Sequence, residues 1–321
     1  MSDTTHTVGW LLALLQLPLL LLAAPLLVGW IKWLKSRLQN RRGPDPLQPW
    51  RDLRKLFAKQ PVVATTASPV FRAAPYIVFV ATLAALAVVP LLAVGLPSAA
   101  IADVIVLVGL LGLARFFLAL AGMDIGTAFG GMGASREMLV SALAEPAMLM
   151  AVFTLAMSAH STNLSSVIAF NLDTGLALRP SYLFALLGMV LVAVAETGRI
   201  PVDNPATHLE LTMIHEAMIL EYSGRHLALM EWAAQLKLML YGVLIVNLFL
   251  PWGLAETPTP AALLGSLALL TLKLMALGAG VAVAETTLAK MRLFRAPQFL
   301  NLAFLLTLLG LLSNVILETG L

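Results

Sequence analysis

Ionisable side chains recur inside stretches of this chain that are otherwise apolar, and in one acid-rich connection between two of them. A charge at mid-bilayer costs on the order of 2.5–3.5 kcal/mol even on the lenient insertion scale, so such groups usually face the interior of a helix bundle. Burial shifts acids and lysines toward neutrality, which suits them to exchange protons. The candidates for a proton path are Glu145, Glu196, Asp203, Glu210, Glu221, Lys237, Lys273 and Glu285.

Structural ion pairs between helices are the alternative for these groups, for instance Glu145 with Arg115. For a single residue the two interpretations are equally acceptable. Six charges in or near apolar stretches, however, are more than structural ion pairs between helices normally require. Pro146 follows Glu145 and frees a backbone carbonyl one turn earlier, where water can enter beside the carboxyl group. The set as a whole therefore favours proton exchange.

The sequence offers few residues that could bind a metal ion or a redox centre. The chain has no cysteine, so it cannot ligate an iron–sulfur cluster or a nickel–iron centre through thiolates. The five histidines lie outside the predicted spans, which disfavours paired haem ligands. His208 and Glu210, or His215 and Glu216, lack a third ligand at helical spacing, so we expect no metal site and no redox centre in this chain.

Eight apolar stretches, each about 20 residues long, must position these groups. Of the residues, 60% are apolar and 12% charged, with a mean hydropathy of +0.91. Lipid offers no partner to an unpaired backbone amide, so the spans must be helices, and we predict an all-α polytopic protein with one membrane domain over residues 1–321. The predicted spans are Gly9–Ile31, Phe71–Leu92, Ile101–Ala121, Glu137–Ala159, Ser181–Gly198, Ala228–Leu250, Ala261–Ala284 and Pro297–Leu317.

The distribution of basic residues predicts that both termini lie on the non-cytoplasmic side. This orientation places sixteen of the twenty Lys and Arg residues in the cytoplasm, three in spans and one outside. The net charge of +3 thus reflects topology and lipid contact, and nucleic acid is not an expected partner. The two long cytoplasmic segments are then Lys32–Arg72 and Arg199–Leu227.

Both cytoplasmic segments carry patterns of their own. Around Trp50–Lys59, apolar residues recur at helical spacing opposite basic ones, which predicts a short amphipathic helix along the interface. That helix contacts either lipid phosphates or a soluble partner. In the second segment Thr207–Tyr222 can form a helix, and its acids face either a partly buried polar cavity or a soluble partner. The glycine-rich stretch Thr127–Arg136 lacks the spacing of a phosphate loop, so we predict a flexible connection.

Two long motifs resemble a known family. RLQNRRGPDPLQPWRDLRKLFAK, at Arg37–Lys59, resembles the first cytoplasmic loop of subunit 1 of respiratory complex I and of the membrane anchors of formate hydrogenlyase and energy-converting nickel–iron hydrogenases. ETGRIPVDNPATHLELTMIHEAMILEYSG, at Glu196–Gly224, resembles that family's second long loop. Only Asp45 and Pro46 separate RRGP from LQP, where complex I chains carry an insertion, so the resemblance favours the hydrogenase branch.

The resemblance implies the function and the partners. Such anchors hold a nickel–iron hydrogenase-like large subunit and a small iron–sulfur subunit, and couple them to antiporter-like membrane subunits in the inner (cytoplasmic) membrane. The chain is then a non-catalytic subunit of an oxidoreductase that links redox chemistry to movement of protons or sodium ions, and the partners carry the iron–sulfur clusters and any nickel–iron centre. Residues expected to dock the soluble arm are Arg41, Arg42, Gly43, Pro44, Arg51, Arg54, Lys55 and Arg199.

Two other functions stay open from the sequence. One is a quinone-binding subunit, with the quinone between the spans and the Arg199–Leu227 loop. Complex I carries a cluster of acids after the position of Asp203, where this chain has Asn204 to Thr207, and this departure weakens a quinone site of that type. The other is an independent secondary transporter, which the lack of internal symmetry disfavours.

Overall fold

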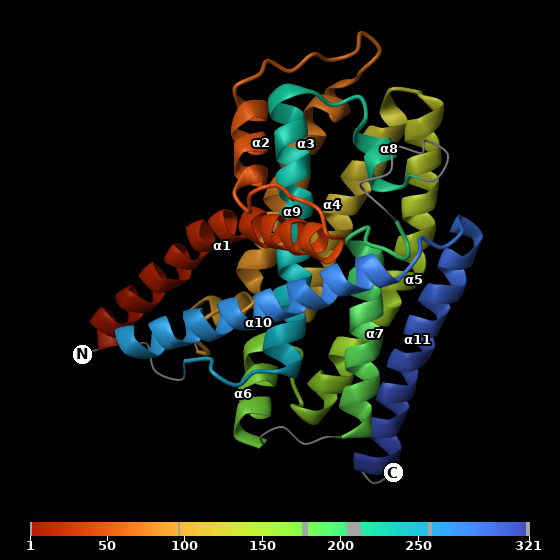
Figure 1. Ribbon diagram of the computed structural model, residues 1–321. Coiled ribbons are helices and arrows are strands. Elements are labelled where there is room, and N and C mark those ends of the chain that lie inside the picture. Colours follow the sequence, from red (N-terminus) through yellow and green to blue (C-terminus); the bar gives the residue numbers. More distant parts are fainter. Residues whose placement is uncertain (1, 96, 175–178, 204–212, 256–258, 319–321) are drawn as a thin grey trace.

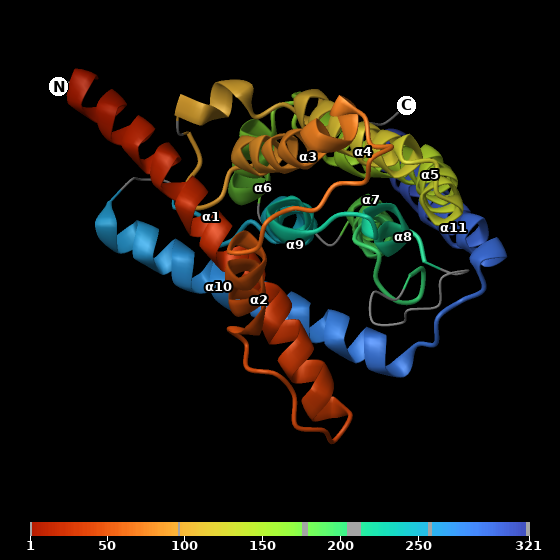
Figure 2. The ribbon, with the colours of Figure 1, turned by 90° about the horizontal axis from the view of Figure 1, so that it is seen from above.

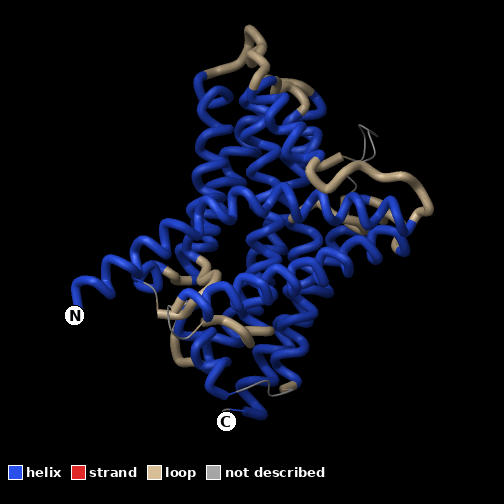
Figure 3. The backbone as a smooth tube through the Cα atoms, turned by 60° about the vertical axis from the view of Figure 1, so that its left-hand side comes forward, coloured by secondary structure: helices blue, strands red, loops and turns tan. Residues whose placement is uncertain are grey.

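The protein is described here from a computed structural model that covers residues 2–95, 97–174, 179–203, 213–255 and 259–318. Over these ranges the backbone forms helices and connecting loops, with no strand beyond two isolated β-bridges. Figure 3 shows the same arrangement, in which tubes of helix are joined by loops. The all-α prediction is confirmed.

Seven of the helices are long and apolar enough to cross a membrane, and an eighth, α7, is shorter at 17 residues. Together they fit the eight predicted spans, whereas the orientation of the termini stays a prediction. The chain is a multi-pass membrane protein. The eight helices are α1 (Ser2–Leu38), α3 (Pro69–Val88), α4 (Val104–Asp124), α5 (Ala128–Ser158), α7 (Pro180–Glu196), α9 (Gly224–Phe249), α10 (Pro260–Thr287) and α11 (Ala296–Ser313).

Side-chain caps fix where several of these helices begin. Ser68, Asp103, Thr127 and Thr259 each accept a hydrogen bond from a backbone N–H of the first turn, which satisfies a donor that has no partner inside the helix. The end of α3 comes earlier than predicted, at Val88, because proline at position 90 cannot continue the helical hydrogen bonding. Boundaries therefore follow caps and prolines more closely than hydropathy.

The prediction of a flexible connection at Thr127–Arg136 is wrong. Helix α5 begins at Ala128 and includes the three glycines, of which Gly130 and Gly133 lie in close contact with other parts of the chain. A Cβ atom on Gly130 would come within 2.0 Å of the Gly122 carbonyl oxygen, and one on Gly133 within 3.0 Å of the Ile214 carbonyl oxygen. These glycines serve close approach between α5, the end of α4 and the segment before α8, so their abundance does not indicate flexibility.

Helix α9 occupies the centre of the molecule and carries its largest buried side chain, Tyr241. Helices α3 and α4 pack on one side of it, and α5, α7 and α11 form a second group (Figures 1 and 2). Helices α1 and α10 lie against each other and cross the remaining helices at a steep angle (Figure 1). This crossing brings the ends of α1 and α10 toward the ends of α7 and α9, where the charged residues gather.

Three short helices complete the described chain. The predicted amphipathic helix is confirmed as α2 (Gln48–Phe57), which buries Leu53 and packs Trp50 and Phe57 against Trp232 of α9. Helix α6 (Leu164–Thr174) was not predicted. Of the segment Thr207–Tyr222, the described part forms only the five-residue helix α8 (His215–Ile219). Residues 204–212, which include Glu210, lie outside the described residues.

Candidate functional site

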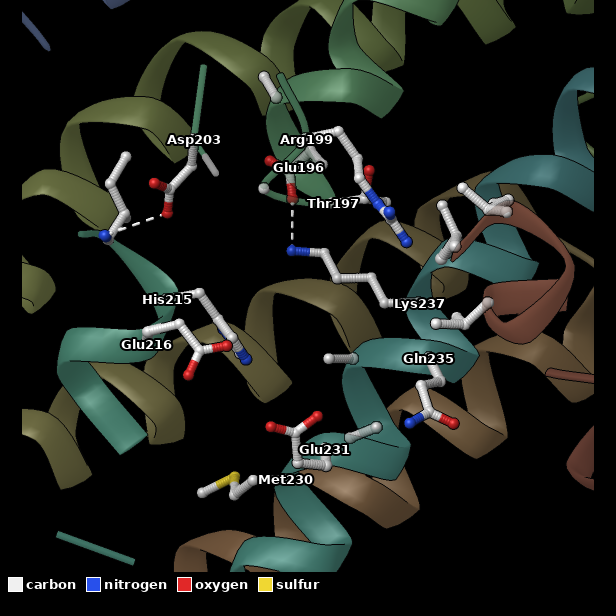
Figure 4. Close-up of a pocket in the computed structure, with 18 of the residues that line it drawn as sticks. Glu196, Thr197, Arg199, Asp203, His215, Glu216, Met230, Glu231, Gln235 and Lys237 are labelled. Carbon is white, nitrogen blue, oxygen red and sulfur yellow. Dashed lines mark hydrogen bonds and ion pairs between the residues drawn. The ribbon is translucent and has the colours of Figure 1, made fainter. Parts of the chain in front are cut away.

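A cavity of about 580 Å³ lies between the steeply crossing pair α1 and α10 and the helices α4, α5, α7 and α9. Its apolar wall includes Val28 and Ile31 of α1, Val78 of α3, and Leu111 and Leu118 of α4. The rest of the wall is rich in ionisable groups, part of which are drawn in Figure 4. These groups are Lys32, Lys35, Arg115, Glu137, Glu196, Arg199, Asp203, His215, Glu216, Glu231, Lys237 and Glu285.

Four of these charged residues and Glu145, which does not line the cavity, form one contiguous group, here named the central cluster: Arg115, Glu137, Glu145, Glu196 and Lys237. Arg115 Nη2 lies 2.6 Å from Glu196 Oε2, and its Nη1 contacts the Glu145 carboxylate. Lys237 Nζ lies 2.8 Å from the same Glu196 oxygen, and Arg115 Nε lies 3.8 Å from Glu137 Oε1. The side chain of Glu196 is 2% exposed and that of Arg115 4%, so these charges compensate one another away from water.

Four helices supply the central cluster. Glu137 and Glu145 are eight residues apart on α5, just over two helical turns, which brings both near the Arg115 guanidinium of α4. Glu196 is the last residue of α7, and Lys237 projects from α9 toward it (Figure 4). The planar guanidinium suits this position because its several N–H donors can reach different carboxylates at once. The ion pair of Glu145 with Arg115 that the sequence allowed is present, within a larger network.

A second ionic group joins the crossing helices to the end of α7. Glu285 of α10 has one carboxylate oxygen 2.8 Å from Lys35 Nζ of α1 and the other 3.0 Å from Arg199 Nη1. The side chain of Arg199 is 12% exposed and turned inward, away from the surface where a soluble partner would dock. This three-residue bridge closes one side of the cavity.

Asp203 fixes the position of the loop that follows α7. Its Oδ2 accepts a hydrogen bond from the backbone N–H of Ile214 at 3.1 Å, and its Oδ1 lies 2.9 Å from Lys290 Nζ. The Met291 N–H donates to the Pro201 carbonyl at 2.9 Å, so the connection between α10 and α11 is held against this loop. Asp203, 3% exposed, therefore ties two connections together at the edge of the cavity.

A third set of polar groups surrounds the same cavity: His215 and Glu216 from α8, and Glu231 and Gln235 from α9 (Figure 4). Burial raises the pKa of Glu216 to about 7, with Glu231 and Asp203 adding to the rise and Lys32 opposing it. Burial also lowers the pKa of His215, which keeps its imidazole neutral near pH 7. A carboxyl group that titrates near neutrality at the edge of a cavity can exchange protons with it.

Buried polar atoms also face this region without a protein partner. Within the described part of the chain, His215 Nε2, Gln235 Oε1 and Arg115 Nε are buried and make no hydrogen bond to protein. Buried atoms of this kind are ordinarily satisfied by water. The site is therefore a polar, water-compatible chamber bounded by charge networks on three sides.

Two predicted proton-path residues lie apart from the cavity. Lys273 Nζ donates to the Leu250 carbonyl at 2.6 Å and to the Trp252 carbonyl, and lies 4.7 Å from the centre of the Trp252 ring. It thus binds the connection after α9, at the end of that helix opposite the cavity. Glu221 is exposed and does not line the cavity.

The predicted docking residues divide into exposed and internal ones. Gly43 lies so close to α1 that a Cβ atom on it would come within 1.7 Å of Ser36 Oγ, and Pro44 lines the cavity. Asp45 pairs with Arg51 at 2.7 Å on the surface. The side chains of Arg41, Arg42, Arg51, Arg54 and Lys55 are exposed, and Pro44 is exposed as well as lining the cavity.

Three acids that line the cavity, Glu137, Glu216 and Glu231, are absent from the predicted proton path. Glu137 was placed at the edge of a predicted span, because the helical continuation through the glycines before it was not anticipated. Its spacing of eight residues from Glu145 was the available signal. Glu231 and Gln235, four residues apart on α9, share a helix face that points into the cavity. Hydropathy alone does not show that this polar helix face lines a cavity.

The sequence matches the family model described as NADH dehydrogenase over residues 11–317. The chain belongs to this family. It is 37% identical to hydrogenase-4 component C of Escherichia coli K12 over 87% of this chain and 88% of that one. It is 34% identical to formate hydrogenlyase subunit 4 of the same organism, over 89% and 92%.

The resemblance to complex I is also confirmed, at a greater distance. NADH-quinone oxidoreductase subunit 8 of Rhodothermus marinus is 28% identical over 74% of this chain and 72% of that one. Among solved structures, a chain of the archaeal membrane-bound sulfane sulfur reductase, a respiratory membrane complex, superposes with a TM-score of 0.80 at 20% identity. That match covers 95% of this chain and 98% of the other, and it supports the fold.

Proposed function

We propose that this chain is the membrane-anchor and coupling subunit of an energy-converting hydrogenase-type complex, in which redox chemistry in soluble partners is linked to proton movement. The observation that carries the proposal is the central cluster, a set of three carboxylates and two cations at the wall of a polar cavity. Relatives named as hydrogenase-4 component C and formate hydrogenlyase subunit 4 support the type of complex.

The cavity supplies the side of the path where protons enter. Glu216 of α8 and Glu231 near the beginning of α9 line the same cavity as Glu196 and Glu137. Below the cluster, Tyr241 is 1% exposed, and its hydroxyl group makes its hydrogen bond to the sulfur of Met148 at 3.4 Å. The chain below is packed with apolar side chains, so a proton that reaches the cluster must leave sideways.

Glu145 provides that sideways exit. Its side chain is 34% exposed, although the same two helices carry large exposed apolar side chains, Phe116 on α4 and Leu139 on α5. A carboxylate that faced lipid at this position would be costly. A neighbouring membrane subunit that carries a proton acceptor, of the antiporter-like type, would cover Glu145 and continue the path.

The soluble arm would dock at the end of the molecule that carries α2. The basic side chains of Arg51, Arg54 and Lys55 are exposed there while Leu53 is buried beneath them, so the helix is anchored from below. Because the chain has no cysteine, the iron–sulfur clusters and any nickel–iron centre belong to the partners. We propose that the complex lies in the inner (cytoplasmic) membrane with the arm in the cytoplasm.

Electrostatics can couple the two activities. Reduction of a partner's redox centre adds negative charge above the cavity and favours proton uptake by the nearest acids, Glu216 and Glu231. The paired acids of the central cluster then exchange partners as the field changes, because Glu196 is held by two cations that can each be drawn toward another carboxylate. The chain itself supplies positioning and proton binding, and it carries out no redox step.

Glu196→Gln tests the proposal in the intact complex. Glutamine keeps the size of the side chain and can still accept from Arg115, so we expect the arm to stay assembled and to turn over its electron donor while proton translocation into vesicles is lost. Asp173→Asn, an exposed acid beyond the cavity on α6, is the matched control and should translocate normally. Unchanged translocation in Glu196→Gln would contradict the proposal.

A quinone-binding subunit is the second candidate function. The cavity is of a size that accommodates small organic ligands, and its apolar wall of Val28, Ile31, Val78, Leu111 and Leu118 favours a quinone ring. The charges opposite that wall disfavour it. The two candidates are separated by adding the electron donor to purified complex and measuring whether an added quinone is reduced.

A further inference from the structure

The central cluster contains more acids than bases. Glu137, Glu145 and Glu196 contribute three negative charges when ionised, and Arg115 and Lys237 contribute two positive ones, so the fully ionised group has a net charge of 2 − 3 = −1. An uncompensated charge is expensive where water is scarce. One bound proton makes the cluster neutral, which is the state that burial favours.

The contacts indicate which acid holds that proton. Glu196 Oε2 receives both Arg115 at 2.6 Å and Lys237 at 2.8 Å, and Glu145 contacts Arg115 Nη1 directly. Glu137 has the weakest compensation, because its nearest cationic atom, Arg115 Nε, is 3.8 Å away, beyond hydrogen-bonding distance. Its side chain is 12% exposed and lines the cavity, from which a proton can reach it.

Among the described residues, the surroundings of Glu137 supply no further cation at contact distance. On its own helix, Arg136 is turned away and donates to the Met213 carbonyl. Lys237, Glu196, Asp203 and Arg115 are the charged groups that act on its carboxyl group, and Asp203 is paired with Lys290. Of the other helices packed on α5, α8 brings His215 and Glu216 to the same cavity, α11 carries no ionisable side chain, and α6 carries only the distant Asp173. Tyr241 of α9 also interacts electrostatically with Glu137.

We propose that the central cluster stores one exchangeable proton, which rests on Glu137 and is passed to Glu145 while Arg115 changes partner. Glu137 takes this proton from water in the cavity. On release the proton passes, by way of water beside the Arg115 guanidinium that both acids contact, to the Glu145 carboxylate, which becomes neutral and loosens its hold on Arg115 Nη1. The Glu137 carboxylate then accepts a hydrogen bond from Arg115 Nε, the buried donor that makes no hydrogen bond within the described residues.

The exchange conserves charge at every stage. The cluster holds one proton, two carboxylates and two cations before and after, so moving the proton between Glu137 and Glu145 creates no uncompensated charge. Arg115 is a positioning residue in this scheme, because it stabilises whichever of the two acids is ionised. This role of Glu137 rests on the proposed coupling function, and it makes Glu137 the residue at which a proton enters the coupling path.

Infrared spectra of the resting intact complex, compared between H2O and D2O, test this assignment. The carbonyl stretch of a protonated carboxylic acid is present at rest if Glu137 is neutral, and it shifts on deuteration because the proton is exchangeable. We expect that resting band to be absent from Glu137→Gln and to persist in Glu145→Gln and in the control Asp173→Asn. In redox-induced difference spectra the same band should change on reduction in the wild type and stay unchanged in Glu145→Gln, where the proton has lost its acceptor. A resting band that survives in Glu137→Gln, is absent from the wild type, or is lost only in Glu145→Gln would overturn the assignment.

Translocation gives an independent readout. Glutamine reproduces the neutral form of Glu137 but cannot release a proton, so Glu137→Gln should retain turnover of the soluble arm and lose translocation, whereas Glu137→Asp should restore part of it. If Glu137 served only to fill space, Glu137→Gln would translocate like the wild type, and the proposal would be wrong. Failure of the coupling function itself would appear differently, as normal translocation in Glu196→Gln.

Discussion

The two ends of the helix bundle contain polar groups of different kinds. Near the cavity they are ionised or ionisable, and several share partners, as Glu196 shares Arg115 and Lys237. At the opposite end they are mostly neutral and paired with backbone. Asn247 Nδ2 donates to the Pro90 and Leu91 carbonyls at 2.8 and 3.2 Å, and Asn171 joins the Tyr182 hydroxyl to the Leu248 carbonyl.

This difference separates groups that can change charge from groups that fix the backbone. A side-chain amide that donates to backbone carbonyls is held in place, because its rearrangement would leave a buried carbonyl unpaired at a cost of about 1–3 kcal/mol. A carboxylate with two cations nearby can lose one and keep the other. The bundle thus combines a rigid end, where the helices are fastened, with an end where charge can be redistributed without unfolding.

The largest effect should come from removing the shared cation. Arg115→Met leaves Glu137, Glu145 and Glu196 with Lys237 as the remaining cation of the cluster, and breaking a buried pair in this way typically costs about 3–5 kcal/mol. We expect a clear loss of thermal stability of the purified complex. Arg115→Lys should restore part of it, because one ammonium group cannot reach three carboxylates.

Arg225→Met provides the matched control for that loss, since Arg225 is exposed at the beginning of α9. Its thermal stability should stay close to that of the wild type. If Arg115→Met were as stable as Arg225→Met, the ion pairs of the central cluster would contribute little to stability. The proposed difference between the two ends of the bundle would then be contradicted.

A pH effect of intermediate size should trace to Glu216. Its pKa is raised from 4.5 to about 7 by burial, so the folded protein favours the neutral acid. Below about pH 4.5 the acid is neutral in both folded and unfolded states. Between about pH 4.5 and 7 the acid is ionised in the unfolded state and still neutral in the folded one, so stability falls over this interval by about 2 kcal/mol after solvent screening and levels off above pH 7.

Measuring stability from pH 5 to 8 in the wild type and in Glu216→Gln checks that contribution. The variant should be the less pH-dependent of the two, and the difference between them should grow with pH. Glu221→Gln, which changes an exposed acid near the same helix, is the control. Identical pH profiles for wild type and Glu216→Gln would show that Glu216 is not held in a buried environment.

The sequence predicted the helices well and the site only in part, for physical reasons. Length and hydropathy determine the spans, because a membrane imposes its thickness on every one of them. Glu145, Glu196 and Lys237 were found because charges in apolar stretches are conspicuous. Which charges meet depends on helix tilt and contact between helices distant in the chain, so the bridge of Lys35, Arg199 and Glu285 could not be derived from the spacing of its members.

Lys273 shows the limit of that reasoning most clearly and gives the smallest expected effect. Like Lys237, Lys273 is a charged residue within an apolar span. Unlike Lys237, it binds the carbonyls of Leu250 and Trp252 at the rigid end. The ammonium group caps the end of α9 and is partly exposed, so Lys273→Met should lower stability by only about 1 kcal/mol. Proton translocation should be unchanged, whereas Lys237→Met, which removes a cation from the central cluster, should impair it. Loss of translocation in Lys273→Met would mean that the charge path extends through the whole bundle and that its two ends do not differ in kind.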